Sequence, residues 1–265
     1  MTIGRRSLRV RLRSGQVALG SWITLAHPAI PEILAQAGFD WLAVDLEHSV
    51  ITIREAEELI RVIDLSGVVP LVRLTANDPH LIQRVMDAGS HGVIVPRVNS
   101  RAEAEAAVAA VHYPPRGRRG VGLARAQGYG TRFDAYRAWL AREAVTIVQI
   151  EHMKAVEQAE AILRVKGVDG YLVGPYDLSA SLGRPGQFTH PAVVRALKSV
   201  HETARRLGVP GGVHVIQPDV AEATRRIREG FTFVAYSMDM LLLGSAARHG
   251  TAALSVAAKR RRGRA

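Results

Sequence analysis

The chain has 265 residues, of which 48% are hydrophobic and 22% are charged, so it carries enough apolar side chains to fill the core of a globular fold. It contains no cysteine, which excludes disulfides, thiolate nucleophiles and thiolate metal sites and leaves oxygen and imidazole as metal ligands. Much of the net charge of +11 lies near the two ends, in RRSLRVRLR and KRRRGR, which argues against a nucleic-acid partner.

The length fits one α/β barrel, which needs about 250 residues. We therefore expect a single domain over residues 1–265, with a barrel core at about 16–250 and a basic tail at 258–265. No apolar run approaches the roughly 20 residues that span a bilayer, and the start of the chain lacks the apolar stretch of a signal peptide. The expected location is the cytoplasm, without a membrane partner.

Eight apolar segments of strand length recur along the chain, with helical patterns between them. Most are nearly continuous apolar runs, as expected for strands covered on both faces. The alternation of strands and helices predicts parallel βαβ units. The expected strands are 17–25, 41–47, 69–74, 92–98, 145–151, 169–174, 211–216 and 231–237.

The segments between the strands carry helix start and stop signals. Residues 28–38 have proline in the first turn and glycine after the last, and Gly89, Gly167, Gly208 and Gly230 each stand just before the next strand. No GxGxxG motif follows the first strand. This regularity favours a closed (β/α)8 TIM barrel over an open doubly wound sheet.

One connection, residues 114–132, is long and rich in Gly, Pro and Arg. Such loops in compact domains are usually functional or disordered. It precedes the strand at 145–151, so within one barrel it would lie on the face opposite the active site. It would then reach the chemistry only across a subunit boundary.

Polar side chains end the second and third strands, where the reactive groups of an α/β barrel project. His48 follows Asp45 and is a candidate base that this carboxylate orients; alternatively it is a hydrogen-bonded loop residue. Arg73 offers a fork of donors for a carboxylate or for the charge of an enolate. Its alternative role is a structural partner of Glu47 or Asp45.

Two further carboxylates lie at the fifth and sixth strand ends. Glu151 and Asp177 are hard oxygen donors that suit Mg²⁺, Mn²⁺ or Co²⁺. Alternatively, both cap the helices that follow them. Burying unpaired charges here would cost several kcal/mol each, which favours a ligand or metal at this cluster.

Other residues argue against competing chemistry or for a supporting role. None of the four lysines lies within an expected strand, which disfavours Schiff-base aldol chemistry. No glycine-rich turn follows the seventh strand, which disfavours a phosphorylated substrate. His152 and His214 are expected to support or pack, Asp78 to cap a helix, and Asp87 to lie at the surface or cap a helix.

An ordered set of motifs resembles the HpcH/HpaI aldolase family from about Gly20 to Leu243. The stretches are AGFDWLAVDLEHS, VRLTANDP, VPRV, YPPRGRRGVG, VQIE and GVDGYLVGPYDLSASLG. The resemblance implies a barrel of the phosphoenolpyruvate/pyruvate-domain type and a class II pyruvate aldolase. That family includes 4-hydroxy-2-oxoheptanedioate aldolase and 2-dehydro-3-deoxyglucarate aldolase.

The resemblance also implies roles for the residues already singled out. It makes Glu151 and Asp177 the metal ligands, Arg73 the group that stabilises the enolate, and His48 the base with Asp45 as its partner. A second set would bind the substrate: Arg73, Gln149, Gly174, Pro175 and Tyr176. Tyr176 stands where the heptanedioate enzyme has a small residue, and it would narrow the acceptor pocket.

Members of the family assemble as hexamers built from trimers, with the final helix exchanged between neighbours. This implies inter-subunit roles for Asp87, Arg125 and Tyr129. The activity implied is formation or cleavage of 4-hydroxy-2-oxoacids through a pyruvate enolate and an aldehyde, with a divalent metal. The alternatives are the same enolate site with another carbonyl acceptor, as in citrate formation or oxaloacetate chemistry, and a non-catalytic basic barrel that binds nucleic acid.

Overall fold

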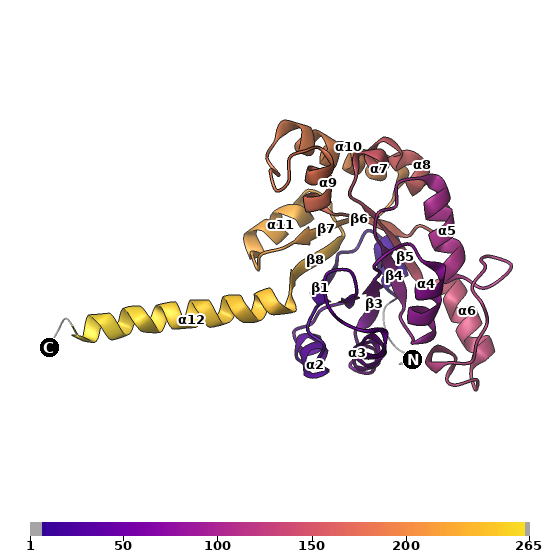
Figure 1. The fold of residues 1–265 in the computed structure, drawn as a ribbon, viewed down its shortest axis with the longest axis horizontal. Helices are drawn as coiled ribbons and strands as arrows, with labels where there is room; N and C mark the ends of the chain where they lie inside the picture. Colours follow the sequence, from indigo (N-terminus) through magenta and orange to yellow (C-terminus); the bar gives the residue numbers. More distant parts are fainter. Residues whose placement is uncertain (1–6, 263–265) are drawn as a thin grey trace.

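Residues 7–262 are described by the computed structural model, and their eight parallel strands close into a barrel in chain order. Each strand pairs with the next, and the last pairs with the first (Figure 1). The (β/α)8 prediction is thereby confirmed, and all eight expected strands are present. They are β1 (Ala18–Ile23), β2 (Trp41–Asp45), β3 (Val69–Arg73), β4 (Gly92–Val95), β5 (Val145–Ile150), β6 (Gly170–Val173), β7 (Gly211–Val215) and β8 (Phe233–Met238).

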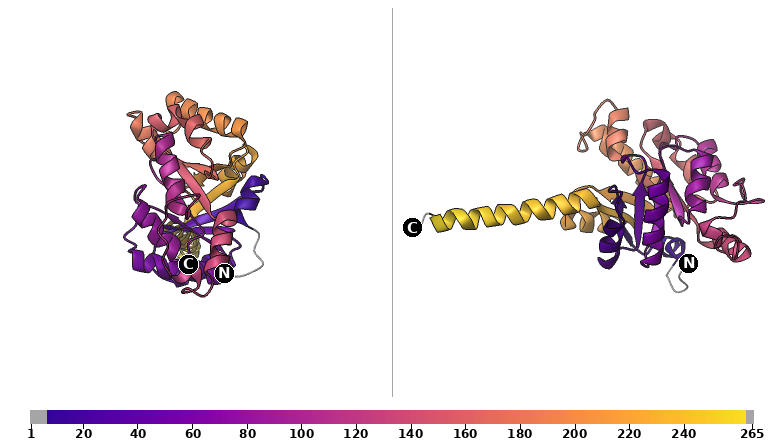
Figure 2. Two further views of the ribbon diagram at one scale, coloured as in Figure 1. Left: turned by 90° about the vertical axis from the view of Figure 1, so that its right-hand side faces the viewer. Right: turned by 60° about the horizontal axis from the view of Figure 1, so that its bottom comes forward.

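Helices lie between successive strands and surround the barrel (Figures 1 and 2). Their starts follow local signals: Thr52 and Glu55 form a capping box at α3, and Asp78 caps α4 as predicted. The helices are α2 (Ala29–Gln36), α3 (Ile53–Leu65), α4 (Pro79–Asp87), α5 (Arg101–Val111), α6 (Phe133–Glu143), α7 (Met153–Glu157), α8 (Ala159–Leu163), α9 (Pro175–Ser181), α10 (Pro191–Leu207) and α11 (Val220–Arg228).

The barrel interior is packed with large side chains. Trp41 stacks on Phe233 with ring centroids 4.3 Å apart, and Trp22 meets Trp41 edge-on. A Cβ at Gly20 would lie 2.0 Å from the Trp41 ring, so glycine there makes room for the indole. Helix α1 (Leu8–Arg13) adds two leucines to this cluster, which also contains the first residues of several strands. The helix therefore closes the amino-terminal end of the barrel.

The loop at 114–132 contains one short 3-10 helix, η1 (Arg125–Gln127), and otherwise no helix or strand. Its Arg125 donates to Asp64 in the last turn of α3 and to the carbonyl of Ala88, just after α4. Both helices end where the next strand begins. The prediction that this loop lies on the face opposite the strand ends is therefore confirmed.

The last helix, α12 (Asp239–Arg262), runs away from the barrel (Figures 1 and 2). Leu243 and Leu254 on it are exposed. The predicted basic tail at 258–265 begins within its last turns, and 263–265 lie outside the described residues. Within the described part of the chain, no helix is both long enough and apolar enough to cross a membrane.

Candidate active site

Arg73 is fixed in place by a carboxylate on the neighbouring strand. Asp45 and Arg73 are register partners at the ends of β2 and β3. Arg73 donates from Nε to Asp45 Oδ1 at 2.8 Å and from Nη2 to Oδ2 at 2.5 Å, and both residues are buried. The guanidinium also lies over the Trp22 ring, 4.4 Å from its centroid. The result is an arginine held rigidly at the mouth of the barrel.

His48 is placed differently from the expected pairing with Asp45. Asp45 Oδ1 accepts the backbone N–H groups of Glu47 and His48, at 3.0 and 3.2 Å, while its two oxygens face Arg73. The His48 side chain is 61% exposed, and its Nε2 lies 3.8 Å from Glu47 Oε2. The strand register sets Arg73 beside Asp45, so the arginine takes the position in which an imidazole was expected.

The Glu47 carboxylate lies near both the His48 ring and the Arg73 guanidinium. Its Oε2 is buried without a hydrogen-bond partner among the described residues and lies 3.7 Å from Arg73 Nε. Burial raises the pKa of Glu47 to about 7, against the opposing effect of Arg73. We expected Glu47 only as a partner of Arg73, and no sequence pattern predicts that one of its oxygens has no hydrogen-bond partner among the described residues.

Glu151 is buried at the end of β5 and accepts two hydrogen bonds. Oε1 accepts the backbone N–H of Arg97 at 2.7 Å, and Oε2 accepts a close contact from the Gln149 amide. Burial raises the pKa of Glu151, and the charge of Asp177 raises it further. Asp177 lies exposed in the first turn of α9. The two predicted metal ligands therefore lie close enough for the charge of Asp177 to act on Glu151.

Glycine is required beside this carboxylate. A Cβ at Gly174 would lie 2.5 Å from Glu151 Oε2 and 2.9 Å from Glu151 Cβ. Its φ of −91° is open to any residue, so the requirement is one of space rather than backbone conformation. Gly174 is the N-cap of α9, and Pro175 is its first residue.

A hard divalent cation fits the donors present. Two neighbouring carboxylates would be relieved of repulsion, and the buried Oε1 of Gln149 has no hydrogen-bond partner among the described residues. Within those residues no group of three or more acidic or histidine side chains is suited to a metal. A cation held here would therefore take its remaining ligands from water or substrate oxygens.

Two further predicted positions differ in their surroundings. Tyr176 is 55% exposed and meets Phe188 edge-on at 4.8 Å. His214 lies in β7, 5.7 Å from the Trp22 ring, with its Nε2 3.3 Å from the carbonyl of Ser237. Burial lowers the pKa of His214 to about 4, and Arg73 adds to this. His214 is therefore a neutral ring that packs against Trp22, the side chain over which the Arg73 guanidinium lies.

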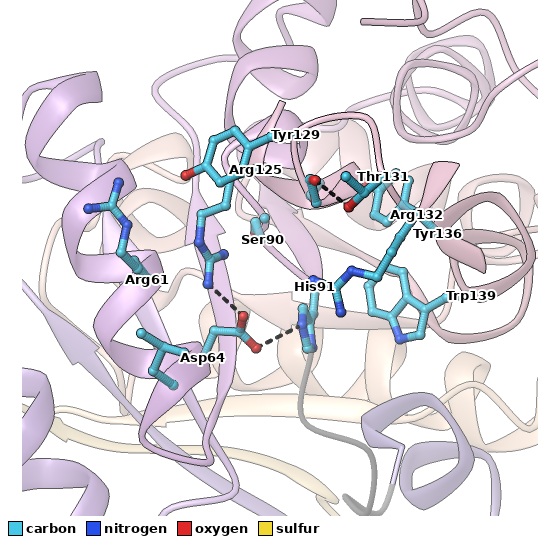
Figure 3. A pocket seen from close by; sticks show the side chains of 14 residues that line it. Arg61, Asp64, Ser90, His91, Arg125, Tyr129, Thr131, Arg132, Tyr136 and Trp139 are labelled. Atoms are coloured by element: carbon cyan, nitrogen blue, oxygen red, sulfur yellow. Dashed lines mark hydrogen bonds and ion pairs between the residues drawn. The ribbon is translucent and has the colours of Figure 1, made fainter. Parts of the chain in front are cut away.

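The predicted inter-subunit residues lie on the opposite face of the barrel, away from Arg73 and Glu151. Figure 3 shows Arg125 pointing toward Asp64, with which it pairs at 2.7 Å, near the exposed Tyr129. Asp87 ends α4, accepts from the Gln127 amide at 3.3 Å, and has a pKa raised by burial. The Asp87 side chain is therefore hydrogen-bonded and partly buried, whereas we expected a surface carboxylate or a helix cap.

Comparison with known proteins agrees with this arrangement. The family model for HpcH/HpaI aldolase/citrate lyase matches residues 18–246. A pyruvate aldolase of Rhizobium etli is 42% identical over 88% of this chain and 91% of its own. A 5-keto-4-deoxy-D-glucarate aldolase of Escherichia coli is 38% identical over 90% of this chain and 92% of its own.

Solved structures give the same answer. A HpcH/HpaI aldolase/citrate lyase family protein from Burkholderia cenocepacia superposes with a TM-score of 0.89 at 33% identity, covering 94% of this chain and 98% of that one. The citrate synthase SbnG superposes with a TM-score of 0.82 at 26% identity, covering 96% of this chain and 98% of that one. The chain therefore belongs to the HpcH/HpaI aldolase/citrate lyase family.

Proposed function

We propose that this protein is a metal-dependent class II pyruvate aldolase that forms and cleaves 4-hydroxy-2-oxoacids through a pyruvate enolate and an aldehyde. One observation carries the proposal: Arg73, clamped by Asp45 over Trp22, shares a barrel mouth with the buried carboxylate of Glu151. The identity of 38% to 42% with two aldolases over most of the chain supports the same reaction type.

Glu151 and Asp177 would hold Mg²⁺, Mn²⁺ or Co²⁺, with Gln149 orienting Glu151. When bound, such a cation polarises the keto group of pyruvate as a Lewis acid and acidifies its methyl group. Two more distant structural neighbours are described with magnesium, at 16% and 18% identity, which bears on the fold alone. The donor set of this chain is therefore what supports the choice of metal.

Arg73 would stabilise the negative charge of the enolate, because its guanidinium is already oriented by Asp45 and needs no reorganisation. The exposed His48 would move protons: in cleavage it accepts the proton of the 4-hydroxyl group as the C3–C4 bond breaks. Gly174 and Pro175, at the start of α9, would lie beside the pyruvate carboxylate and shape its site.

The direct test measures pyruvate release from a 4-hydroxy-2-oxoacid by the wild type and by the Arg73→Ala and His48→Ala variants. The expected loss is at least about a hundredfold in kcat/KM for each variant, with an unchanged circular dichroism spectrum. Near-full turnover by either variant would remove that residue from the mechanism.

The same enolate site could serve another carbonyl acceptor. The likeness to a citrate synthase at 26% identity favours this second candidate. Incubating pyruvate with oxaloacetate and, separately, with aldehydes distinguishes the two, because only one class of acceptor would consume pyruvate rapidly.

We further propose that residues 1–265 form one domain in a cytoplasmic homohexamer, a dimer of trimers that exchanges the final helix. The projecting α12, with exposed Leu243 and Leu254, supports an exchanged helix. The loop face that carries Asp87, Arg125 and Tyr129 would meet a neighbouring subunit. Light scattering coupled to gel filtration tests the assembly, and a monomer at micromolar concentration would contradict it.

A further inference from the structure

Arg97, just after β4, has an uncommon backbone conformation that ties it to the candidate metal ligand. Its φ is +51°, a left-handed value that few residues other than glycine adopt. In this conformation its N–H donates to Glu151 Oε1 at 2.7 Å, and its carbonyl accepts from the Asn99 amide at 3.0 Å. The strained backbone thus fixes where the Arg97 side chain begins.

The guanidinium of Arg97 lies at the mouth of the barrel with free donors. Its Nη2 donates to the carbonyl of Thr75 at 2.8 Å, the one hydrogen bond that its side chain makes within residues 7–262. The nearest carboxylate oxygen is Glu47 Oε1 at 3.8 Å, and the Arg97 side chain is 64% exposed. An arginine has five N–H donors, so most of these face solvent.

Arg73 and Arg97 flank the same carboxyl group but differ in availability. Glu47 lies 3.7 Å from Arg73 Nε through one oxygen and 3.8 Å from Arg97 Nη2 through the other. Arg73 is buried and engaged on two atoms by Asp45. Arg97 is therefore the cation of this pair that can bind an incoming anion, within reach of a short molecule that also contacts Arg73.

Arg97 lines an open groove with a volume of about 480 Å³. Ala76, Pro96 and Ala102 give it small apolar walls. The one acid lining it, Glu103, is already bonded to the backbone N–H of Asn99 at 2.5 Å. The groove therefore leaves room for the tail of a substrate beside a guanidinium whose nearest carboxylate oxygen lies 3.8 Å away.

We propose that Arg97 is a specificity-determining residue that binds the carboxylate of a short carboxylated aldehyde acceptor. The inference rests on the proposed aldolase function and assigns the part of the site that selects the acceptor. A guanidinium binds a carboxylate through charge-assisted hydrogen bonds, which neutral aldehydes cannot form.

The test is aldol addition of pyruvate to succinic semialdehyde, which carries a carboxylate, and to propionaldehyde, which does not. For each enzyme the ratio of the two kcat/KM values is measured with Mn²⁺ present. Arg97→Gln is expected to lower this ratio at least about tenfold. Arg97→Lys keeps the charge but loses the fork, so its ratio is expected to lie between those of the wild type and Arg97→Gln.

Arg101→Gln is the matched control, because Arg101 is an exposed arginine four residues away that pairs with Glu105. Its ratio should equal that of the wild type. An Arg97→Gln ratio within twofold of the wild type would overturn the inference while leaving the aldolase assignment intact. Absence of product with both aldehydes in the wild type would instead overturn the proposed function and the inference with it.

Discussion

Arg73 and Asp45 meet because parallel pairing sets them side by side as the last residues of β3 and β2. Arg73 is buried and held by this carboxylate, while the His48 side chain is 61% exposed. The mechanism proposed above therefore assigns charge stabilisation to a preorganised group and proton transfer to a solvent-accessible one.

Gly174→Ala tests the crowding at the candidate metal ligand. The new methyl group would meet Glu151 Cβ at 2.9 Å, so the carboxylate must shift. We expect Mn²⁺ affinity, measured by calorimetry, to fall at least about tenfold. Gly250→Ala in α12 is the control, because no atom lies within 4 Å of its added Cβ. Equal affinity in both variants and the wild type would contradict the assignment of Glu151.

Which site residues the sequence could reveal depended on their surroundings. Arg73 and Glu151 stand at the ends of apolar strands, and Asp177 follows another strand in the first turn of α9, so their positions were predictable. Trp22 and His214 lie within strands and resemble ordinary core residues, so their place beneath Arg73 required the structure. The pairing of Asp45 with the Arg73 side chain depends on the strand register, which periodicity does not determine.

At the scale of elements, the start of α3 depends on two side chains. Thr52 accepts the N–H of Glu55 through its hydroxyl, and Glu55 in turn accepts the backbone N–H of Thr52 at 2.7 Å. We expect Thr52→Ala to lower the free energy of unfolding by about 1 kcal/mol, measured with urea. Thr224→Ala is the control, because Thr224 bonds only the carbonyl of Val220 within its own helix. The cap assignment fails if both variants lose the same stability.

The strands were predictable because their apolar runs are long and each is followed by clear helix signals. Other elements were not. Helix α1 alternates arginines with apolar residues and packs only two leucines into the barrel, which is too few to reveal its role. The projection of α12 away from the barrel could not be predicted either, because the residues of a helix do not determine its direction relative to the barrel (Figure 1).

At the scale of the whole molecule, one buried histidine accounts for part of the pH dependence of the free energy of unfolding. His112 is 1% exposed, and burial lowers its pKa to about 3, helped by Arg116. Between pH 6.5 and 3 the unfolded chain binds a proton that the folded chain does not, so stability falls as the pH falls. The expected loss from pH 7 to pH 5 is about 2 kcal/mol. His112→Gln should remove this share of the slope in urea unfolding and leave the share of His214, whose pKa burial also lowers. An unchanged slope would contradict the assignment.

We propose above that residues at the mouth of the barrel form a pyruvate enolate with the help of a divalent metal. The most direct measurement follows pyruvate release from a 4-hydroxy-2-oxoacid after the protein is treated with a chelator and then supplied with Mn²⁺, Co²⁺ or Mg²⁺. We expect the chelator to abolish activity and the added metal to restore it, and we expect no restoration in the Glu151→Gln variant. Full turnover in the presence of the chelator would contradict the proposal.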